Sequence, residues 1–251
     1  MAGLRLIQTY SSDSDEDKHD DKEDDKIVNK LALPDSISSW KGVSYHEEVV
    51  DDPLGHDGRI RSFKHERGNW ATLVYIKYTA NDCLHTWINS ILNELPVQGD
   101  IISSLHISLS RTLVLKFHWI ESFVEGIKLL CRQFNQFVIQ LTDIKVYCNE
   151  EKTRTFLGIY CQDENGVLKC LTEALDNLLA GYQLPSFYKD TSYHISFFWC
   201  LGDKQECLKE ILPSLTCSLN KFLAENMEDA YVHVNEIQCK IGNKYYAFEL
   251  K

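Results

Sequence analysis

Two segments that lie far apart in the chain, LHISL at residues 105–109 and YHISF at residues 193–197, decide how this sequence is expected to fold. In a β-strand, successive side chains point to opposite faces. Each segment therefore places its histidine and serine on one face and three apolar side chains on the other. Such a strand can bury its apolar face in a core while it presents an imidazole and a hydroxyl together on the opposite face. None of the other seven histidines is followed two residues later by serine.

The paired motif suits cleavage of a phosphodiester bond by a neighbouring ribose 2′-hydroxyl. That reaction needs a base to take the hydroxyl proton and an acid to protonate the leaving 5′-oxygen, and histidine can serve either purpose near neutral pH. We therefore expect His106 and His194 to be the catalytic pair, and Ser108 and Ser196 to stabilise charge on the phosphate oxygens. One His-x-Ser segment is usually structural, but two copies with the same alternation favour function. No carboxylate cluster offers a metal site, so we predict neither a metal nor another cofactor.

Outward from these segments, strands and helices alternate without the regular order of a parallel α/β fold. Strands, rich in β-branched and aromatic residues, are predicted at residues 70–79, 102–109, 137–148, 153–161, 192–200, 230–239 and 244–250. Helices, with apolar residues at helical spacing, are predicted at residues 84–95, 119–134, 168–179 and 204–223, the last of them interrupted near Pro213. This order favours the α+β class. Because strand, helix and strand follow one another in both halves of the chain, we expect two similar lobes.

The first 30 residues are expected to be a disordered acidic tail. Residues 11–26 contain nine acids and three lysines, a net charge of −6, so the rest of the chain carries −5 of the total of −11. Residues 31–58 are turn-rich and are predicted to be a loosely structured lead-in, and residues 59–251 are predicted to form the folded domain. Because this folded part is not basic, RNA binding is expected to be local, in a cleft that holds a few nucleotides.

Other features of the composition narrow the class of protein. The chain lacks the roughly 20-residue apolar run of a membrane span, and its nine cysteines include no C-x-x-C pair and no zinc-ligand spacing. We therefore expect a soluble, intracellular protein with reduced cysteines and no membrane partner. A monomer is assumed.

The two motif copies resemble the H-x-[ST]-x pair of the 2H phosphoesterase superfamily. Longer segments narrow the match: residues 59–72, 149–158 (NEEKTRTFLG), 187–203 (FYKDTSYHISFFWCLGD) and 239–246 (CKIGNKYY) resemble the eukaryotic U6 small nuclear RNA 3′-end processing phosphodiesterases. The resemblance runs from about residue 59 to the C-terminus. It implies two pseudo-symmetric lobes, each with an antiparallel sheet and flanking helices, and an active-site cleft between them.

The resemblance also implies an activity. The family trims the oligouridine tail of U6 RNA from its 3′ end through attack by the 2′-hydroxyl, and it leaves a 2′,3′-cyclic phosphate that some members open to a 3′-phosphate. RNA is then the partner, the nucleus the location, and no metal is required. By motif match His106 is expected to be the base and His194 the acid, with Ser108 and Ser196 holding the phosphate.

Further residues match nucleotide-binding positions of the family. Tyr188 matches the aromatic residue on which a base stacks, and Glu150 stands where the family has glutamine, which bears on base preference. Four more residues belong to the expected nucleotide-binding set: Ser192, Tyr193, Ile107 and Ile195. Three basic residues in or beside the family-like segments are expected either to contact backbone phosphates or to be solvated: Lys152, Arg154 and Lys240.

Three other functions stay open at this point. A different 2H enzyme, acting on small cyclic nucleotides or 2′–5′ linkages, would keep both histidines but not necessarily Tyr188 or the NEEKTRTF turn. A non-catalytic nucleotide- or RNA-binding module usually has an eroded motif, whereas both copies here are intact. A purely structural or interaction protein would need some other use for the two His-Ser faces.

Overall fold

The computed structural model of the protein describes residues 63, 66–189 and 191–251. These residues all belong to a compact unit that spans residues 49–251. The acidic tail predicted for residues 1–30 and the lead-in predicted for residues 31–58 lie outside the described residues, so both remain predictions.

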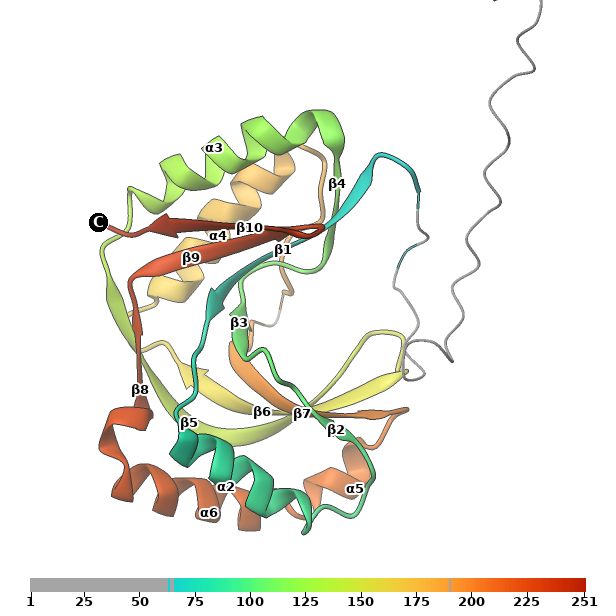
Figure 1. Cartoon of the computed structure of the whole chain (residues 1–251), viewed down its shortest axis with the longest axis vertical. Coiled ribbons are helices and arrows are strands. Elements are labelled where there is room, and N and C mark those ends of the chain that lie inside the picture. Colours follow the sequence, from blue (N-terminus) through green and yellow to red (C-terminus); the bar gives the residue numbers. More distant parts are fainter. Residues whose placement is uncertain (1–62, 64–65, 190) are drawn as a thin grey trace, which may run out of the picture. The chain divides into compact units, whose positions relative to one another are not determined.

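A ten-stranded antiparallel sheet forms the framework of this unit (Figure 1). Its strands are, in chain order, β1 (Asn69–Lys77), β2 (Asp100–Ile101), β3 (His106–Ser108), β4 (Leu113–Lys116), β5 (Phe137–Cys148), β6 (Arg154–Gln162), β7 (His194–Leu201), β8 (Tyr231–Val234), β9 (Glu236–Ile241) and β10 (Lys244–Glu249). Alternate strand residues are buried against the helices, which leaves the other face of the sheet, here called the open face, free for polar side chains. Strand β4, which pairs with β1, and the two-residue strand β2 were not predicted from the sequence, and the strand predicted at residues 102–109 is confirmed only at residues 106–108, as β3.

Five α-helices cover the apolar face of the described sheet. They are α2 (Asp82–Leu92), α3 (Ile120–Cys131), α4 (Val167–Ala180), α5 (Gln205–Lys209) and α6 (Leu212–Glu225), with short 3-10 turns at Phe117–Trp119 and Met227–Ala230. The helix boundaries follow local chemistry. Asn81 caps α2 by accepting a hydrogen bond from the Leu84 amide, and Pro213 lies in the first turn of α6, where a missing N–H costs nothing. The predicted interruption near Pro213 is confirmed, because α5 ends at Lys209 and α6 begins at Leu212.

The strand order explains how the two His-x-Ser segments meet. Along the sheet the order is β10-β9-β1-β3-β7-β6-β5-β8, with β4 added beside β1 and β2 beside β7. Strands β3 and β7, which carry the two segments, are therefore direct neighbours at the centre. Every pairing in the sheet is antiparallel.

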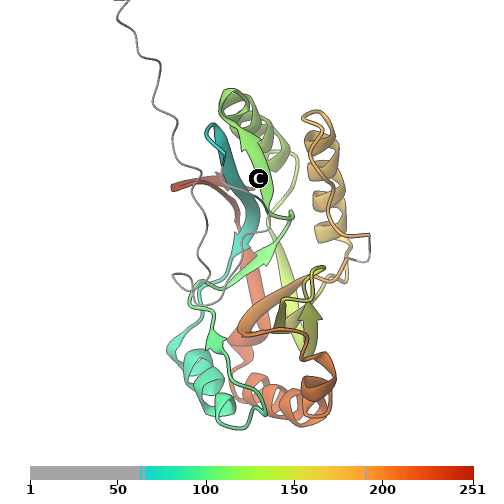
Figure 2. The ribbon, with the colours of Figure 1, turned by 90° about the vertical axis from the view of Figure 1, so that its right-hand side faces the viewer.

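Two lobes flank this centre, as predicted, but neither lobe is one half of the chain (Figures 1 and 2). Helix α2, from the first half, packs on α6, from the second half, and the Trp87 ring stacks on Phe222 with 5.8 Å between ring centroids. Helix α4, from the second half, packs on α3, from the first half. There Gly126 lies so close to Leu178 that an added Cβ would be 2.8 Å from it. Each lobe is thus built by exchange of helices between the halves.

The C-terminal strands β8 and β9 connect the two ends of the sheet. Residues 230–239 were predicted as one strand, but the structure breaks them at Asn235 into β8 and β9. Strand β8 pairs with β5 at one edge of the sheet, and β9 pairs with β1 and β10 near the other edge. Because a single residue separates β8 from β9, the sheet must curl until its two ends come together, and Figure 1 shows this curl.

Candidate active site

The pairing of β3 with β7 brings the two predicted catalytic segments into one cluster. Ile107 lies opposite Ile195 in an antiparallel register. This register places His106 across from Ser196, and Ser108 across from His194, all on the open face. The two histidines are then diagonal neighbours, related by an approximate two-fold axis through the isoleucine pair. The four residues that the motif predicted as the reactive set thus lie together.

The isoleucines between them serve the core. Ile107 and Ile195 are both 0% exposed, and their side chains point to the face that the helices cover. Both belong to the expected nucleotide-binding set, but with side chains in the core they could contact a nucleotide only through the backbone. Their buried side chains anchor the paired strands beneath the reactive face.

Both imidazoles are held in the same way. Nδ1 of His106 lies 2.9 Å from the carbonyl oxygen of Ser104, and Nδ1 of His194 lies 2.7 Å from that of Ser192. A carbonyl oxygen only accepts, so each Nδ1 carries the hydrogen and donates it. In the neutral ring, Nε2 then has a free lone pair, and in the protonated ring it carries a proton to give. This is the arrangement that acid–base catalysis by two histidines requires.

The surroundings of the two imidazoles differ. The His106 ring meets Tyr75 of β1 edge-on, with 5.5 Å between ring centroids and an interplanar angle of 69°. The His194 ring lies flat on Tyr147 of β5, with 3.6 Å between centroids and an angle of 13°. Burial lowers the pKa of His194 to about 4, and the charges of His106 and Lys145 act in the same direction. The carbonyl of Ser192 opposes the shift by accepting the Nδ1 proton. His194 is therefore neutral at pH 7 in the free protein.

The predicted base-stacking residue belongs to a charged cluster that the sequence did not reveal. Tyr188 is 44% exposed, and the guanidinium of Arg111 lies over its ring, 4.1 Å from the centroid. Arg111 also makes two contacts with the carboxylate of Glu150, at 2.9 and 3.1 Å. Arg111 follows β3, Glu150 belongs to the turn after β5, and Tyr188 precedes β7. The cluster therefore links the segment after β3, the turn after β5 and the segment before β7.

Ser192 and Tyr193 have structural contacts that the sequence did not predict. The Ser192 hydroxyl lies 3.1 Å from the Tyr147 hydroxyl, while its carbonyl holds His194. The Tyr193 side chain is buried, and its hydroxyl lies 2.7 Å from the hydroxyl of Thr172 in α4. Tyr193 is thus a core side chain that ties β7 to α4, and its carbonyl oxygen accepts a hydrogen bond from the Cys161 amide at 2.9 Å.

The basic residues fall at different places. Lys152 is exposed, and its Nζ lies 3.4 Å from a carboxylate oxygen of Asp203. These contacts agree with the expectation of a solvated charge. Arg154 lies half-buried at the start of β6, on the same face as Gly158, and Lys240 lies exposed on β9 beside Tyr245. Lys145, which the sequence did not single out, lies on the open face of β5 with its Nζ 3.2 Å from the centroid of the Tyr160 ring. The alternation within residues 137–148 was the signal for Lys145 and Tyr147, because both share the face opposite Ile144.

Neither a metal site nor a membrane helix was found in the part of the chain that the structure describes. There, no group of three or more His, Cys, Asp or Glu side chains is placed to hold a metal ion. Likewise, no described helix is both long and apolar enough to cross a bilayer.

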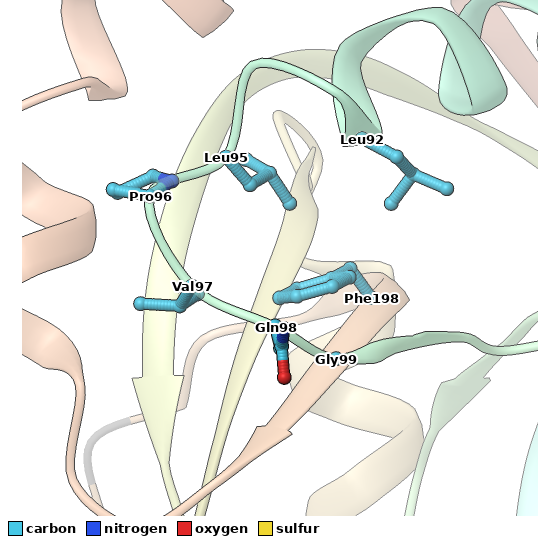
Figure 3. Close-up of a pocket in the computed structure, with 7 residues that line it drawn as sticks. All are labelled: Leu92, Leu95, Pro96, Val97, Gln98, Gly99 and Phe198. Carbon is cyan, nitrogen blue, oxygen red and sulfur yellow. The ribbon is translucent and has the colours of Figure 1, made fainter.

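A hollow lined by Leu92, residues 95–99 and Phe198 contains neither histidine (Figure 3). A bulge in β7 after Ser196 turns Phe198 toward this hollow and away from the open face.

Comparison with known proteins adds to this geometry. A family model described as "HVSL: Uncharacterised conserved protein" matches residues 31–249. A protein named U6 snRNA phosphodiesterase 1 from Danio rerio is 37% identical over 235 residues, covering 90% of this chain and 82% of that protein. Its namesake from Drosophila melanogaster is 35% identical over 251 residues, covering 96% and 95%. The structure of Kluyveromyces marxianus Usb1 with uridine monophosphate has a TM-score of 0.50 at 13% identity, covering 72% of this chain and 98% of that one. This last likeness confirms the predicted fold.

Proposed function

Because the chain belongs to the U6 snRNA phosphodiesterase 1 family, we propose that it is a phosphodiesterase that processes the 3′ end of U6 small nuclear RNA. The observation that carries this proposal is the pairing of β3 with β7, which sets His106 and His194 side by side with both Nε2 atoms available. Such an enzyme acts on RNA in the nucleus. The alternatives that lack catalysis give no reason for two imidazoles with the same orientation.

The cleavage step follows from the chemistry of the four side chains. The 2′-oxygen of the penultimate ribose attacks the neighbouring phosphorus, and the bond from phosphorus to the 5′-oxygen of the last nucleoside breaks. One Nε2 takes the proton of the 2′-hydroxyl, and the other Nε2 gives its proton to the leaving 5′-oxygen. Ser108 and Ser196 donate hydrogen bonds to the non-bridging oxygens as charge develops on them. The RNA is left with a 2′,3′-cyclic phosphate and is one residue shorter.

The pKa of His194 bears on which histidine is the base and which is the acid. The family resemblance favours His106 as base and His194 as acid. In the free protein the low pKa of His194 keeps the imidazole unprotonated at pH 7, whereas an acid must carry its proton at the start of the step. A bound phosphate brings negative charge beside His194, and this raises the pKa of the imidazole again. If His194 is the acid, as predicted, binding of the RNA must raise the pKa of His194 enough for its imidazole to become protonated.

The substrate end is proposed to lie over the cluster of Tyr188, Arg111 and Glu150. An exposed tyrosine face is a stacking surface for a base, and a guanidinium stacked on it adds a second planar surface and a positive charge. Both Glu150 oxygens are engaged by Arg111. Contact between Glu150 and a uracil edge therefore competes with this ion pair. A stack on one terminal base suits an exonuclease that removes uridines one at a time.

One experiment tests the proposal. The purified protein is incubated in EDTA with a 3′-hydroxyl oligouridine RNA, beside His106→Ala and His194→Ala variants whose folding is checked by circular dichroism. We expect stepwise shortening from the 3′ end, with a terminal cyclic phosphate or 3′-phosphate by mass spectrometry, and loss of activity in both variants. Parallel reactions on 2′–5′ linked RNA and on small cyclic nucleotides test the other 2H activities. Tight RNA binding without shortening would refute the enzyme and favour a binding module.

A further inference from the structure

The approximate two-fold axis of the active site relates the two histidines but not the residues that support them. On one side, Ser108 faces Tyr75 of β1, and Tyr75 in turn faces Gln238 of β9. At the equivalent position on the other side, Ser196 faces Gly158 of β6, and Gly158 faces Lys145 of β5. Gly158 thus stands at the position equivalent to Tyr75, and it has no side chain to match the tyrosine ring. The space that it would fill is open to other groups.

The His194 and Tyr147 rings occupy that space. A Cβ built on Gly158 would lie 2.9 Å from Cδ2 of His194 and 3.1 Å from Cε2 of Tyr147. Both distances are shorter than an ordinary carbon–carbon contact of about 3.5–4.0 Å. The two rings therefore lie over the glycine backbone, and any larger residue at this position would displace them.

Tyr147 is also tied to His194 through a third residue. Its hydroxyl lies 3.1 Å from the hydroxyl of Ser192, whose carbonyl oxygen accepts the Nδ1 hydrogen of His194 at 2.7 Å. The ring stack and these two hydrogen bonds therefore join Tyr147, Ser192 and His194 to one another in a closed set of contacts. Of the ring pairs in the described structure that include a histidine, only this one is parallel and close, while that of His106 with Tyr75 is edge-on.

We propose that Tyr147, seated over Gly158, is a positioning residue for the catalytic His194. The stack holds the imidazole plane so that Nε2 faces the phosphate, and it keeps water from the back of the ring. In this role Tyr147 acts through the imidazole on which it stacks. This inference rests on the proposed function for its kinetic consequence, but the stack and its effect on His194 can be measured without RNA.

The charged and titratable groups around His194 agree with this role. His106 faces it from β3, Lys145 and Tyr147 from β5, and Tyr160 from β6. Burial raises the pKa of Tyr147 to about 12, so this phenol stays neutral and offers no charge to stabilise an imidazolium. Loss of the Tyr147 ring would admit water to His194, and the pKa of His194 would then rise toward its ordinary value of 6.5.

The test compares Tyr147→Leu and the gentler Tyr147→Met with Tyr147→Phe, which keeps the ring. We expect kcat on oligouridine RNA to fall roughly 10- to 100-fold in Tyr147→Leu and Tyr147→Met with KM changed less than about twofold, and to fall far less in Tyr147→Phe. In an NMR titration of the free protein, the His194 midpoint should move upward by about one pH unit or more in the first two variants. Tyr182→Leu, which removes a half-buried ring between α3 and α4, is the matched control and should shift neither quantity.

Two results would overturn the proposal. One is an unchanged His194 titration in variants that lack the ring, and the other is an equal loss of kcat in Tyr147→Phe and Tyr147→Leu. The NMR measurement separates this proposal from the proposed function. If the wild-type protein does not shorten RNA, the function falls, while a shifted His194 midpoint still supports the stack. If RNA is shortened but the midpoint does not move, the function stands and the positioning role falls.

Discussion

Replacement of Gly158 by alanine is the smallest change that should disable the active site. The added methyl group would lie 2.9 Å from the His194 ring and 3.1 Å from the Tyr147 ring, so one or both rings must move by about 0.5 Å to restore ordinary contacts. Catalytic groups must be held within about 0.5 Å of their productive positions, so this shift reaches the limit, and a 1 Å error can cost about 100-fold in rate. We therefore expect kcat to fall roughly 10- to 100-fold, and overpacking to cost about 1–3 kcal/mol of unfolding free energy.

The assay is single-turnover shortening of an oligouridine RNA, with thermal unfolding measured on the same preparations. Gly126→Ala is the matched control. Its Cβ would also meet a side-chain atom at 2.8 Å, but that atom belongs to Leu178 in the contact of α3 with α4, away from the histidines. The control should change stability and leave kcat as in the wild type. An active Gly158→Ala protein, with kcat within twofold of the wild type, would refute the close packing over Gly158 as a catalytic requirement.

Other predictions concern pH, recognition and the core. The folded pKa of His194, about 4, is below its unfolded value of 6.5, so the unfolded chain binds a proton first as pH falls. Stability should therefore decline between about pH 6.5 and pH 4, by at most about 3 kcal/mol, and His194→Asn should flatten this slope in urea titrations. Tyr188→Ala should weaken binding of a uridine oligonucleotide roughly 5- to 150-fold by fluorescence anisotropy, through the lost stack, while Tyr188→Trp should retain it. Glu150→Gln should lower KM for RNA by releasing Arg111 toward the phosphates, and should change the unfolding free energy by less than about 1 kcal/mol, because the pair is exposed. An increase in KM would contradict this account. Tyr193→Phe should cost about 1 kcal/mol in thermal unfolding, from the lost bond to α4, and should leave KM unchanged.

Much of the fold was visible in the sequence because local patterns are set by local geometry. The strand predicted at residues 137–148 is β5 with the same bounds, and the helix predicted at residues 168–179 is α4 within one residue at each end. The four-residue strand β4 was missed, since so short a run carries little periodicity. The break at Asn235 was missed as well, because both sides of it read as strand and only the curl of the sheet requires a turn there.

The motif residues were likewise evident in the sequence, while the residues that support them were not. His106, His194, Ser108 and Ser196 are marked by the repetition of their motif. The supporting residues occur singly, and the alternation within residues 137–148 could place Lys145 and Tyr147 on one face of a strand but could not show that this face adjoins His194. Arg111 lies three residues after the serine of the first motif, but its partner Glu150 is in another turn, and the ion pair exists only when the two segments meet.

The sequence by itself therefore determined the elements and the reactive groups of this protein, because the faces of a strand and the apolar stripe of a helix are written in residue order. Tertiary structure decided which elements became neighbours, through burial of apolar faces that no short segment can satisfy alone. It exchanged α2 and α4 between the lobes, and it placed β3 beside β7. It also made the two histidines unequal, since Gly158 on one side admits the Tyr147 ring that buries His194, while Tyr75 occupies the matching place beside His106.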